Sequence, residues 1–176
     1  MNFFFETFAT PLGAFSIAVN DAGVVVGTAF GTEPALRQRL PACHLMDDKQ
    51  VVRPAKTQVL EYFASQRRAF DLPLAPLGTA FQHRVWSALE KIPPGQTRSY
   101  GQLAAALGNS RASRAVGRAN ATNPICLIVP CHRVIGADGS LTGFAFGEDI
   151  KRALLAHEQT ISQRPLGRTS SALSVV

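Results

Sequence analysis

The sequence predicts an α+β fold, in which a small α/β roll is followed by a mostly helical half that contains a helix-turn-helix. Three observations support this prediction. The strings LGAFSIAV and VVVGTAF flank the turn-forming NDAG, which is the pattern of two neighbouring strands. Capping-box patterns at Thr79 and at Ser99 each open a helix in the second half. An arginine-rich helical segment then follows the helix that Ser99 opens.

The composition indicates a folded protein with a polyanionic partner. The 176 residues suffice for one domain or two small ones, and 46% hydrophobic residues suffice for a packed core. The net charge of +6 favours nucleic acid as a partner. Three cysteines, an odd number, argue against a disulfide framework and for the reducing cytoplasm. Because the N-terminal apolar stretch is short and lacks a basic region before it, we expect neither a signal peptide nor a membrane span.

In the first half, helices and a proline-rich segment follow the paired strands. We expect a short helix over 33–40 and a longer one over 54–70. The apolar stripe of the longer helix comprises Val59, Leu60 and Phe63. The string FDLPLAPLG predicts an edge strand or a linker, because proline is confined to sheet edges. Since Cys43 and His44 have no second pair at metal-ligand spacing, a surface loop is favoured over a metal site.

Helix start and stop signals punctuate the second half. The helix that opens with Thr79 and Gln82 ends before the string PPG, which begins at Pro93. Its apolar face comprises Phe81, Val85 and Leu89, with Trp86 beside them. The helix that opens with Ser99 and Gln102 carries Leu103 and Leu107 and meets Gly108, a typical C-terminal stop. We therefore expect two short helices here.

The next helix combines small residues with a basic face. Ser110 can cap it. Its small face comprises Ala112, Ala115, Val116 and Ala119, and its basic face comprises Arg111, Arg114 and Arg118. Helices that read base edges in the major groove carry long polar side chains, which this one has only at its arginines. Two interpretations stay open: tight packing against another helix, or insertion into the minor groove with one arginine as a wedge.

The reactive residues lie where an apolar run ends. In NPICLIVPCHRVIG, the run from Ile125 to Val129 precedes Cys131, His132 and Arg133. A thiol attacks as the thiolate, and a nearby base or positive charge favours that form. Adjacent side chains in extended chain diverge, so a bridging water would be needed to link Cys131 to His132. Glu158 offers a carboxylate to orient the histidine. The alternative is that Cys131 is a small buried hydrophobe.

Several motifs together resemble the O6-alkylguanine-DNA alkyltransferases, also called methylated-DNA–protein-cysteine methyltransferases. The motifs are PCHRVIGADGSLTGF with its upstream Asn-Pro, PPGQTRSYGQLAAALG and SRAVGRAN. The resemblance is close from Thr79 to Glu158 and covers the first half in outline. It implies a ribonuclease-H-like N-terminal domain over 1–77 and a winged-helix-like C-terminal domain over 78–162. A flexible tail is then expected over 163–176.

The resemblance also implies a reaction. A guanine alkylated at O6 is flipped out of the duplex, because its target atom is unreachable inside the stack. Cys131 matches the residue that takes the alkyl group irreversibly, so that the protein acts once. His132 matches the water-linked base and Glu158 the carboxylate that orients it. Asn123 matches the residue that holds the active-site turn. Tyr100 matches the tyrosine that helps rotate the nucleotide and stabilises the leaving guanine.

Further residues match the family's DNA surface and pocket. Arg114 matches the arginine inserted into the vacated stack. The other expected DNA-binding residues are Arg111, Ser113, Ala115, Gly117, Arg118, Ala121 and Thr122. The expected pocket residues are Arg133, Val134, Phe144, Ala145 and Phe146. The expected partner is double-stranded DNA, contacted in the minor groove by a monomer that needs no cofactor. The alternative is an alkyltransferase-like protein that binds lesions without transfer, although such proteins lack the acceptor cysteine.

The pocket loop departs from the family pattern. Family members usually read Gly-Tyr-Ala/Ser-Gly-Gly, whereas this chain reads GFAFG from Gly143. Phe144 keeps an aromatic wall without the hydroxyl, and Phe146 replaces a glycine. We expect a narrower pocket that slows the transfer of bulky groups such as benzyl; a displaced loop would instead widen it. Glu148 and Asp149 add negative charge near the expected DNA surface, and the family's zinc site has no matching residues here.

Overall fold

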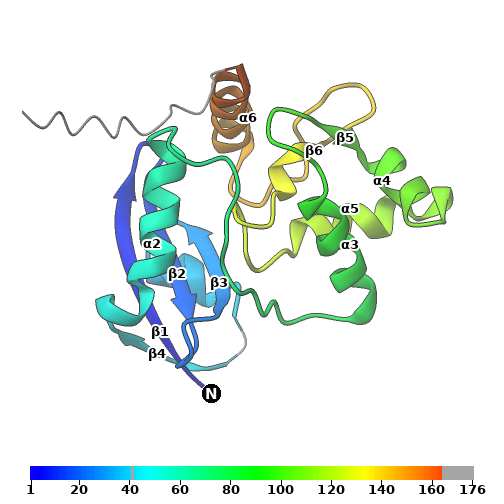
Figure 1. The fold of residues 1–176 in the computed structure, drawn as a ribbon. Helices are drawn as coiled ribbons and strands as arrows, with labels where there is room; N and C mark the ends of the chain where they lie inside the picture. Colours follow the sequence, from blue (N-terminus) through cyan, green and yellow to red (C-terminus); the bar gives the residue numbers. More distant parts are fainter. Residues whose placement is uncertain (41, 164–176) are drawn as a thin grey trace, which may run out of the picture.

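The computed structural model describes residues 1–40 and 42–163, and its N-terminal half is built on a four-stranded sheet in the order β3-β2-β1-β4 (Figure 1). The strands are β1 Asn2–Thr10, β2 Gly13–Val19, β3 Val25–Phe30 and β4 His44–Asp47. The first three pair antiparallel, and β4 lies parallel to β1. The paired strands on either side of NDAG are thus confirmed, whereas β1 and β4 were not predicted.

A helix covers each face of this sheet, which explains why β3 is buried along its whole length. Helix α2, Lys49–Phe63, lies on one face (Figure 1). Helix α1, Glu33–Arg37, lies on the other and buries Leu36. The predicted bounds 54–70 are wrong because the side chain of Asp48 caps α2 by accepting from the Gln50 and Val51 amides. Leu60 is exposed, and the buried stripe is instead Val52, Ala55, Val59 and Tyr62.

The C-terminal half is mostly helical, so the α+β class is confirmed. Its elements are α3 Ala80–Glu90, β5 Arg98–Ser99, α4 Tyr100–Ala106, the 3-10 turn η1 Ser110–Ala112, α5 Ser113–Ala121, the 3-10 turn η2 Cys131–Arg133, β6 Val134–Ile135 and α6 Glu148–Gln163. Both predicted capping boxes, at Thr79 and at Ser99, are present. The cap between α4 and α5 is Asn109 rather than Ser110, because the Asn109 side chain accepts from the Arg111 amide.

The two halves share one hydrophobic core rather than meeting across a solvated gap. The segment 70–78 runs between them as a linker that touches the sheet at one bridge, from Leu74 to Val25. Farther along β3, the amide of Thr28 donates to the Pro124 carbonyl at 2.8 Å. Its hydroxyl donates to the Cys126 carbonyl at 2.7 Å. The sheet therefore holds the segment that leads to Cys131.

The tail expected over 163–176 lies outside the described residues apart from Gln163, with which α6 ends. Among residues 1–40 and 42–163, no helix combines the length and apolarity that crossing a membrane requires.

Candidate active site

A tight buried turn presents Cys131. The side chain of Asn123 accepts from the Ile125 amide at 3.0 Å and donates to the Val129 carbonyl at 2.9 Å. Within this turn Leu127 has a φ of 72°, in the left-handed region. That conformation costs a residue with a side chain about 1–2 kcal/mol. The amide oxygen and nitrogen of Asn123 thus hold a strained loop whose end fixes the position of Cys131.

Cys131 is buried, with 4% of its surface exposed, and it begins the turn η2. Its carbonyl accepts from the Asn120 side chain at 3.2 Å. Burial raises the pKa of the Cys131 thiol, while the Asn123 side chain and the cations of Arg39 and Lys151 oppose that rise. The thiol is therefore protonated at neutral pH and needs a base to become a nucleophile.

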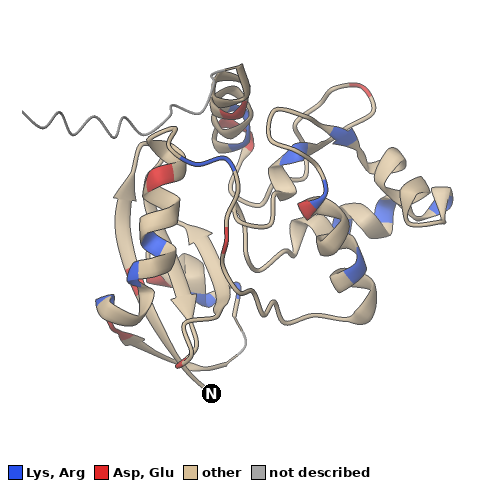
Figure 2. Ribbon diagram, viewed as in Figure 1, with Lys and Arg blue, Asp and Glu red and all other residues tan. Residues whose placement is uncertain are grey.

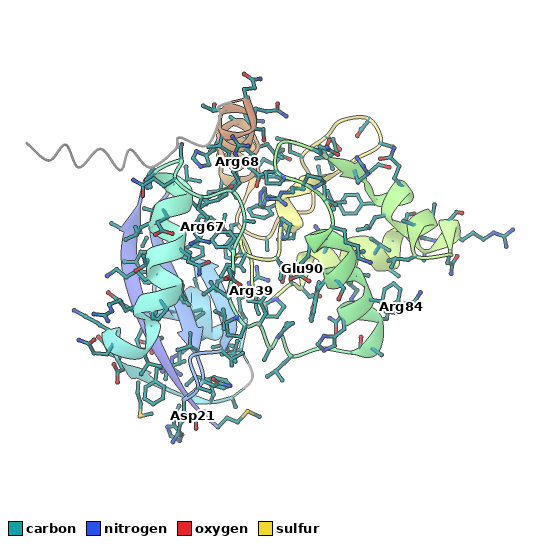
Figure 3. The ribbon with its side chains drawn as sticks, in the orientation of Figure 1. Asp21, Arg39, Arg67, Arg68, Arg84 and Glu90 are labelled. Atoms are coloured by element: carbon teal, nitrogen blue, oxygen red, sulfur yellow. The ribbon has the colours of Figure 1, made fainter. Side chains whose placement is uncertain are left out.

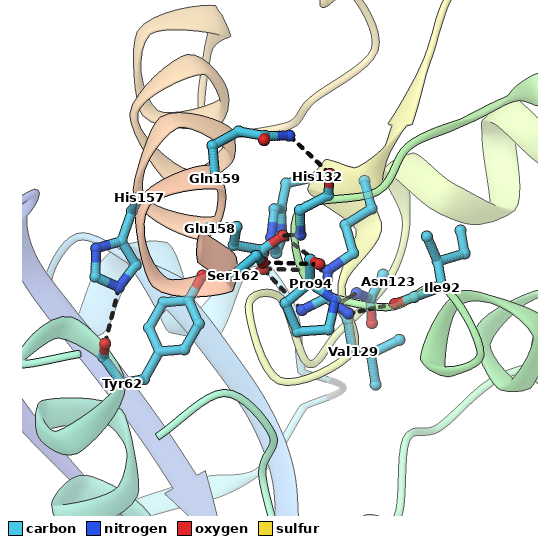
Figure 4. A network of polar contacts seen from close by, with 12 residues as sticks. Tyr62, Ile92, Pro94, Asn123, Val129, His132, His157, Glu158, Gln159 and Ser162 are labelled. Carbon is cyan, nitrogen blue, oxygen red and sulfur yellow. Dashed lines mark hydrogen bonds and ion pairs between the residues drawn. The ribbon is translucent and has the colours of Figure 1, made fainter. Parts of the chain in front are cut away.

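A buried carboxylate, Glu158 of α6, collects hydrogen bonds from both halves of the molecule (Figure 4). Its Oε1 accepts from His132 Nε2 at 2.9 Å, from Arg133 Nη2 at 2.7 Å and from the Tyr62 hydroxyl at 3.1 Å. Its Oε2 accepts from Arg133 Nε at 3.0 Å and from the Gly95 amide at 3.2 Å. Burial alone would raise the pKa of Glu158, but His132 and Arg133 outweigh it and bring that pKa to about 2. The carboxylate is therefore charged.

His132, the middle residue of η2, is fully buried and contacts Glu158. Burial lowers the pKa of His132, and Glu158 offsets part of that effect, so the ring is neutral at neutral pH. An ionised carboxylate only accepts, so we assign the ring hydrogen to Nε2, which faces Glu158. The other nitrogen, Nδ1, is buried and has no hydrogen-bond partner among the described residues. His132 thus offers a lone pair on Nδ1 for a proton.

Arg133 was expected in the substrate pocket, and the structure corrects this expectation. Its guanidinium bonds Glu158 through Nε and Nη2 and the Ile92 carbonyl through Nη1. Each of the three guanidinium nitrogens therefore has a partner inside the protein. Next to it, Val134 is buried and begins β6.

Lys151 of α6 is a site residue that the sequence reasoning missed. Its side chain is buried, and Nζ donates to the Val134 carbonyl at 2.6 Å and to the Thr142 carbonyl at 3.3 Å. Burial lowers the pKa of Lys151, whereas a charge on Cys131 or Glu148 raises it. A signal was present: Lys151 and Glu158 are seven residues apart, on the same helical face as the buried Leu154.

Tyr100, the first residue of α4, fills the space between α5 and the loop 140–147. Its hydroxyl donates to the Thr142 carbonyl at 3.1 Å. A Cβ added to Gly143, whose φ is +80°, would lie 2.6 Å from that hydroxyl oxygen, so the loop requires glycine there. Gly117 of α5 lies under the ring, where an added Cβ would be 3.6 Å from Tyr100 Cδ1. Burial, and then the charge of a Cys131 thiolate, raise the pKa of Tyr100, so its hydroxyl stays protonated.

The ring of Phe146 packs toward the N-terminal half, contrary to the expected narrowing of the pocket. Its centroid lies 5.6 Å from that of Phe30 on β3 and 5.7 Å from that of Phe144, both edge to face. The guanidinium of Arg39 lies 4.6 Å above its face, at the junction of the two halves (Figure 3). Arg39 also donates to the Ala121 carbonyl at 3.0 Å. The loop is thus tied to the sheet, with Phe144 half-buried beside it and Ala145 exposed.

Helix α5 packs on α3 and α4 with one face and exposes the other. Only part of the small face predicted from the sequence is buried: Val116 and Ala119 point inward, and Ala115 is exposed. Arg111, Arg114 and Arg118 are all exposed, and none of them forms an ion pair within the part of the chain that the structure describes. Figure 2 shows Lys and Arg residues, in blue, on the helices of this half.

The remaining expected DNA-surface residues have mixed environments. Ser113 and Gly117 are half-buried. Ala121 is half-buried as well, and its carbonyl is used by Arg39. The hydroxyl of Thr122 donates to the Arg118 carbonyl at 3.0 Å and accepts from the Gln82 side chain at 3.0 Å. At the start of α6, Glu148 and Asp149 are exposed, and Asp149 pairs with Arg152 at 3.2 Å.

The other two cysteines differ from Cys131. Cys126 is buried, and the Thr28 hydroxyl lies 3.3 Å from its sulfur. Burial, and then the charge of a Cys131 thiolate, raise the pKa of Cys126 to about 12, so it is inert as a nucleophile. Cys43 is half-buried beside β4. Within residues 1–40 and 42–163, no group of three or more His, Cys, Asp or Glu side chains is arranged to hold a metal ion.

Comparisons with known proteins agree for both halves of the chain. Residues 3–76 match the family model for the 6-O-methylguanine DNA methyltransferase, ribonuclease-like domain, and residues 80–160 match its DNA binding domain. A methylated-DNA–protein-cysteine methyltransferase of Methanosarcina barkeri is 44% identical over 157 residues, which are 89% of this chain and 97% of that protein. One from Methanosarcina acetivorans is 55% identical over 113 residues, 64% of this chain and 72% of that protein.

A solved structure is similar over nearly the same span. The crystal structure of Mycobacterium tuberculosis OGT in complex with DNA is 39% identical, with a TM-score of 0.79, covering 90% of this chain and 94% of that one. Both family models match, one on each half, and the M. barkeri relative is matched over almost its full length. The chain therefore belongs to the 6-O-methylguanine DNA methyltransferase family.

Proposed function

We propose that this protein repairs double-stranded DNA by transferring the alkyl group of O6-alkylguanine to the sulfur of Cys131. The observation that carries the proposal is a protonated buried thiol beside a neutral histidine whose other nitrogen is held by a charged carboxylate. That arrangement supplies a base for the thiol proton only when His132 is neutral and correctly oriented. Family membership and the names of the relatives support the same activity.

The transfer is one displacement at carbon. The thiol proton passes through a water to Nδ1 of His132, and Glu158 stabilises the imidazolium that forms. The sulfur–carbon bond forms while the bond from that carbon to O6 breaks. The guanine leaves as an anion stabilised by the Tyr100 hydroxyl and takes up a proton from solvent, to which His132 returns its own. Water does not hydrolyse the thioether at neutral pH, so each protein molecule acts once.

The DNA surface follows from the exposed face of α5. We infer that α4 and α5 act as a helix-turn-helix whose second helix enters the minor groove. The target guanine is flipped out, and Arg114 enters the space that it leaves. Arg111 and Arg118 contact phosphates, since both are exposed and carry no protein ion pair among the described residues. Small side chains bring the backbone close to the groove: Ser113, Ala115, Gly117, Ala121 and Thr122.

The flipped base occupies a pocket formed by Tyr100 and the loop 140–147. In this proposal the backbone near Val134 and Ala145 binds the base edge, and Phe144 supplies an aromatic wall. We further propose a cytoplasmic monomer without a cofactor, divided into an N-terminal domain over 1–77 and a C-terminal domain over 78–162. The M. tuberculosis OGT structure, solved in complex with DNA, supports DNA as the partner.

The test is the intact mass of the protein after incubation with a duplex that contains one O6-methylguanine. The wild type gains one methyl group, and peptide mapping finds it on Cys131. Cys131→Ser binds the duplex and gains nothing, because a hydroxyl is a far weaker nucleophile at neutral pH. Cys126→Ser, the matched control, gains the methyl as the wild type does. Binding without any mass gain in the wild type would favour the lesion-binding alternative, and a methyl on Cys131→Ser would eliminate Cys131 as acceptor.

A further inference from the structure

Tyr62 brings the N-terminal half into the proton-transfer network. It lies near the C-terminal end of α2, and its hydroxyl donates across the junction of the halves to Glu158 Oε1 at 3.1 Å. Figure 4 shows it approaching the carboxylate from the side opposite Ile92 and Asn123. No step of the proposed reaction needs Tyr62 for substrate contact, and the side chain is fully buried. Its hydroxyl therefore acts through Glu158.

The hydroxyl is held firmly in this position. The His157 ring lies 4.9 Å from the Tyr62 ring, and its Nε2 bonds the Tyr62 carbonyl at 2.8 Å. The Phe70 and Phe63 rings lie 5.4 Å and 5.3 Å away. Burial, and then the negative charge of Glu158, raise the pKa of Tyr62 well above its usual range. Tyr62 is therefore a fixed, protonated donor at neutral pH.

Glu158 Oε1 accepts hydrogen bonds from more side chains than it has lone-pair sites. A carboxylate oxygen offers about two lone-pair sites. Three side chains share those of Oε1: His132, Arg133 and Tyr62. Each donor draws on the same negative charge, so the Tyr62 hydroxyl reduces what remains to stabilise a proton on His132. Arg133 has a second contact on Oε2, whereas His132 depends on Oε1 alone.

We propose that Tyr62 is a positioning residue that sets the basicity of His132 through the shared oxygen of Glu158. The inference rests on the proposed function, in which neutral His132 takes the proton of Cys131. By weakening the hold of Glu158 on an imidazolium, Tyr62 keeps His132 neutral to lower pH. The N-terminal half thereby tunes the base that the C-terminal half uses.

Other charges act on the same groups and stay in place when the hydroxyl is removed. Glu158 and Lys151 of α6, and Arg133 of η2, act on His132. Cys131 is the adjacent thiol. His157 contacts Tyr62 at its ring and carbonyl, not at its hydroxyl. Tyr62→Phe therefore removes one donor from Oε1 and keeps the ring packing and every formal charge.

The test is the titration of His132 followed by NMR in the full chain labelled with ¹³C at histidine, in wild type and Tyr62→Phe. The chain has only four histidines, so the His132 signal is assigned by its loss in His132→Gln. We expect the His132 midpoint to rise by about 0.5 pH unit in Tyr62→Phe, because a lost hydrogen bond to the carboxylate leaves more charge for the imidazolium. The acid limb of the methyl-transfer rate should move the same way, to higher pH.

The control is His157→Phe, which keeps a ring against Tyr62 and removes the bond to its carbonyl. It should lower the melting temperature and leave the His132 midpoint where it is in the wild type. The proposal is overturned if the His132 titration midpoint in Tyr62→Phe equals that of the wild type. It is also overturned if His157→Phe shifts that midpoint as much as Tyr62→Phe does. The NMR titration needs no DNA, so a failure to methylate Cys131 would reject the proposed function while leaving this comparison readable.

Discussion

The turn that carries Cys131 and the exposed face of α5 handle charge in opposite ways. Around Cys131 the ionised groups are buried, and Glu158 bonds four partners at once. On η1 and α5 the three arginines, Arg111, Arg114 and Arg118, are exposed and form no ion pair with any described residue. Charges that a protein buries must be satisfied internally, whereas charges left unpaired are available to a partner. Substitutions around Cys131 should therefore change both the stability of the protein and its alkyl transfer. Substitutions of the exposed arginines should change only its interaction with DNA.

The largest effect is expected from Glu158→Gln. The change leaves the buried Arg133 without its counter-charge, which typically costs about 3–5 kcal/mol of the free energy of unfolding. It also removes the group that stabilises the His132 imidazolium, so methyl transfer should fall with it. Urea unfolding and single-turnover rates measure the two effects. Glu148→Gln, on the exposed first turn of the same helix, should change stability by less than about 1 kcal/mol; equal losses in the two variants would contradict the contrast.

Arg114→Ala should leave the stability of the protein unchanged and slow its reaction with duplex DNA. Its stability should stay within about 0.5 kcal/mol of the wild type, because the side chain is exposed. Its transfer rate on duplex should fall by about tenfold or more, since the vacated stack is left unfilled and unstacking costs a few kcal/mol. Arg111→Ala and Arg118→Ala should instead weaken binding and lower the salt slope by about one each. A wild-type rate for Arg114→Ala on duplex would exclude the wedge role.

The buried network should also set the acid stability of the protein. Burial depresses the pKa of His132 below 6.5, and the His132 and Arg133 contacts depress that of Glu158 from 4.5 to about 2. In both cases the unfolded chain binds more protons than the folded one. Stability is therefore full at neutral pH and falls as the pH drops below 6.5, with the Glu158 contribution lost between about 4.5 and 2. Urea denaturation at a series of pH values from neutral to acid measures this loss of stability. A free energy of unfolding that rises on acidification would contradict the prediction.

The smallest effect on transfer is expected from Phe146→Gly. Edge-to-face aromatic pairs are worth about 0.5–1.5 kcal/mol each, so the loss of the Phe30 and Phe144 contacts should lower the melting temperature. Because the ring packs on the sheet, the ratio of benzyl to methyl transfer should stay at the wild-type value. Phe30→Leu, which removes the partner ring from the other side, should reproduce the stability loss. A ratio that rises only in Phe146→Gly would place the ring in the pocket after all.

The sequence predicted those helices whose first turn is fixed by neighbouring residues. The capping boxes at Thr79 and Ser99 lie within four residues of the helices that they open, and both were found from the sequence. Strand β1 was missed because a helix covers each face of its sheet, so FFFETF lacks the alternation of a half-buried strand. Strand β4 was missed because it is short and mostly exposed. The end of α2 was misplaced because the apolar residues that follow it continue the helical spacing.

The candidate site divides in the same way. His132 and Glu158, which were paired first from their residue types and then through the resemblance, are in contact in the structure. Tyr62 and Arg39 could not be found from sequence patterns, because their contacts join segments 96 and 82 residues apart. Arg133 was misplaced for a related reason: a cation beside a cysteine suggests a substrate contact until its buried partner is known. Long-range pairing, rather than residue type, is what the sequence reasoning lacked.

The most direct test of the division between chemistry and recognition is the single-turnover transfer rate on two substrates, the O6-methylguanine duplex and the free O6-methylguanine base. Arg114→Ala should be slower than the wild type on the duplex and equal to it on the free base. His132→Gln should be slower on both by the same factor, because the proton transfer is needed wherever the base comes from. A loss in Arg114→Ala that is equal on the two substrates, or a loss in His132→Gln confined to the duplex, would contradict the account.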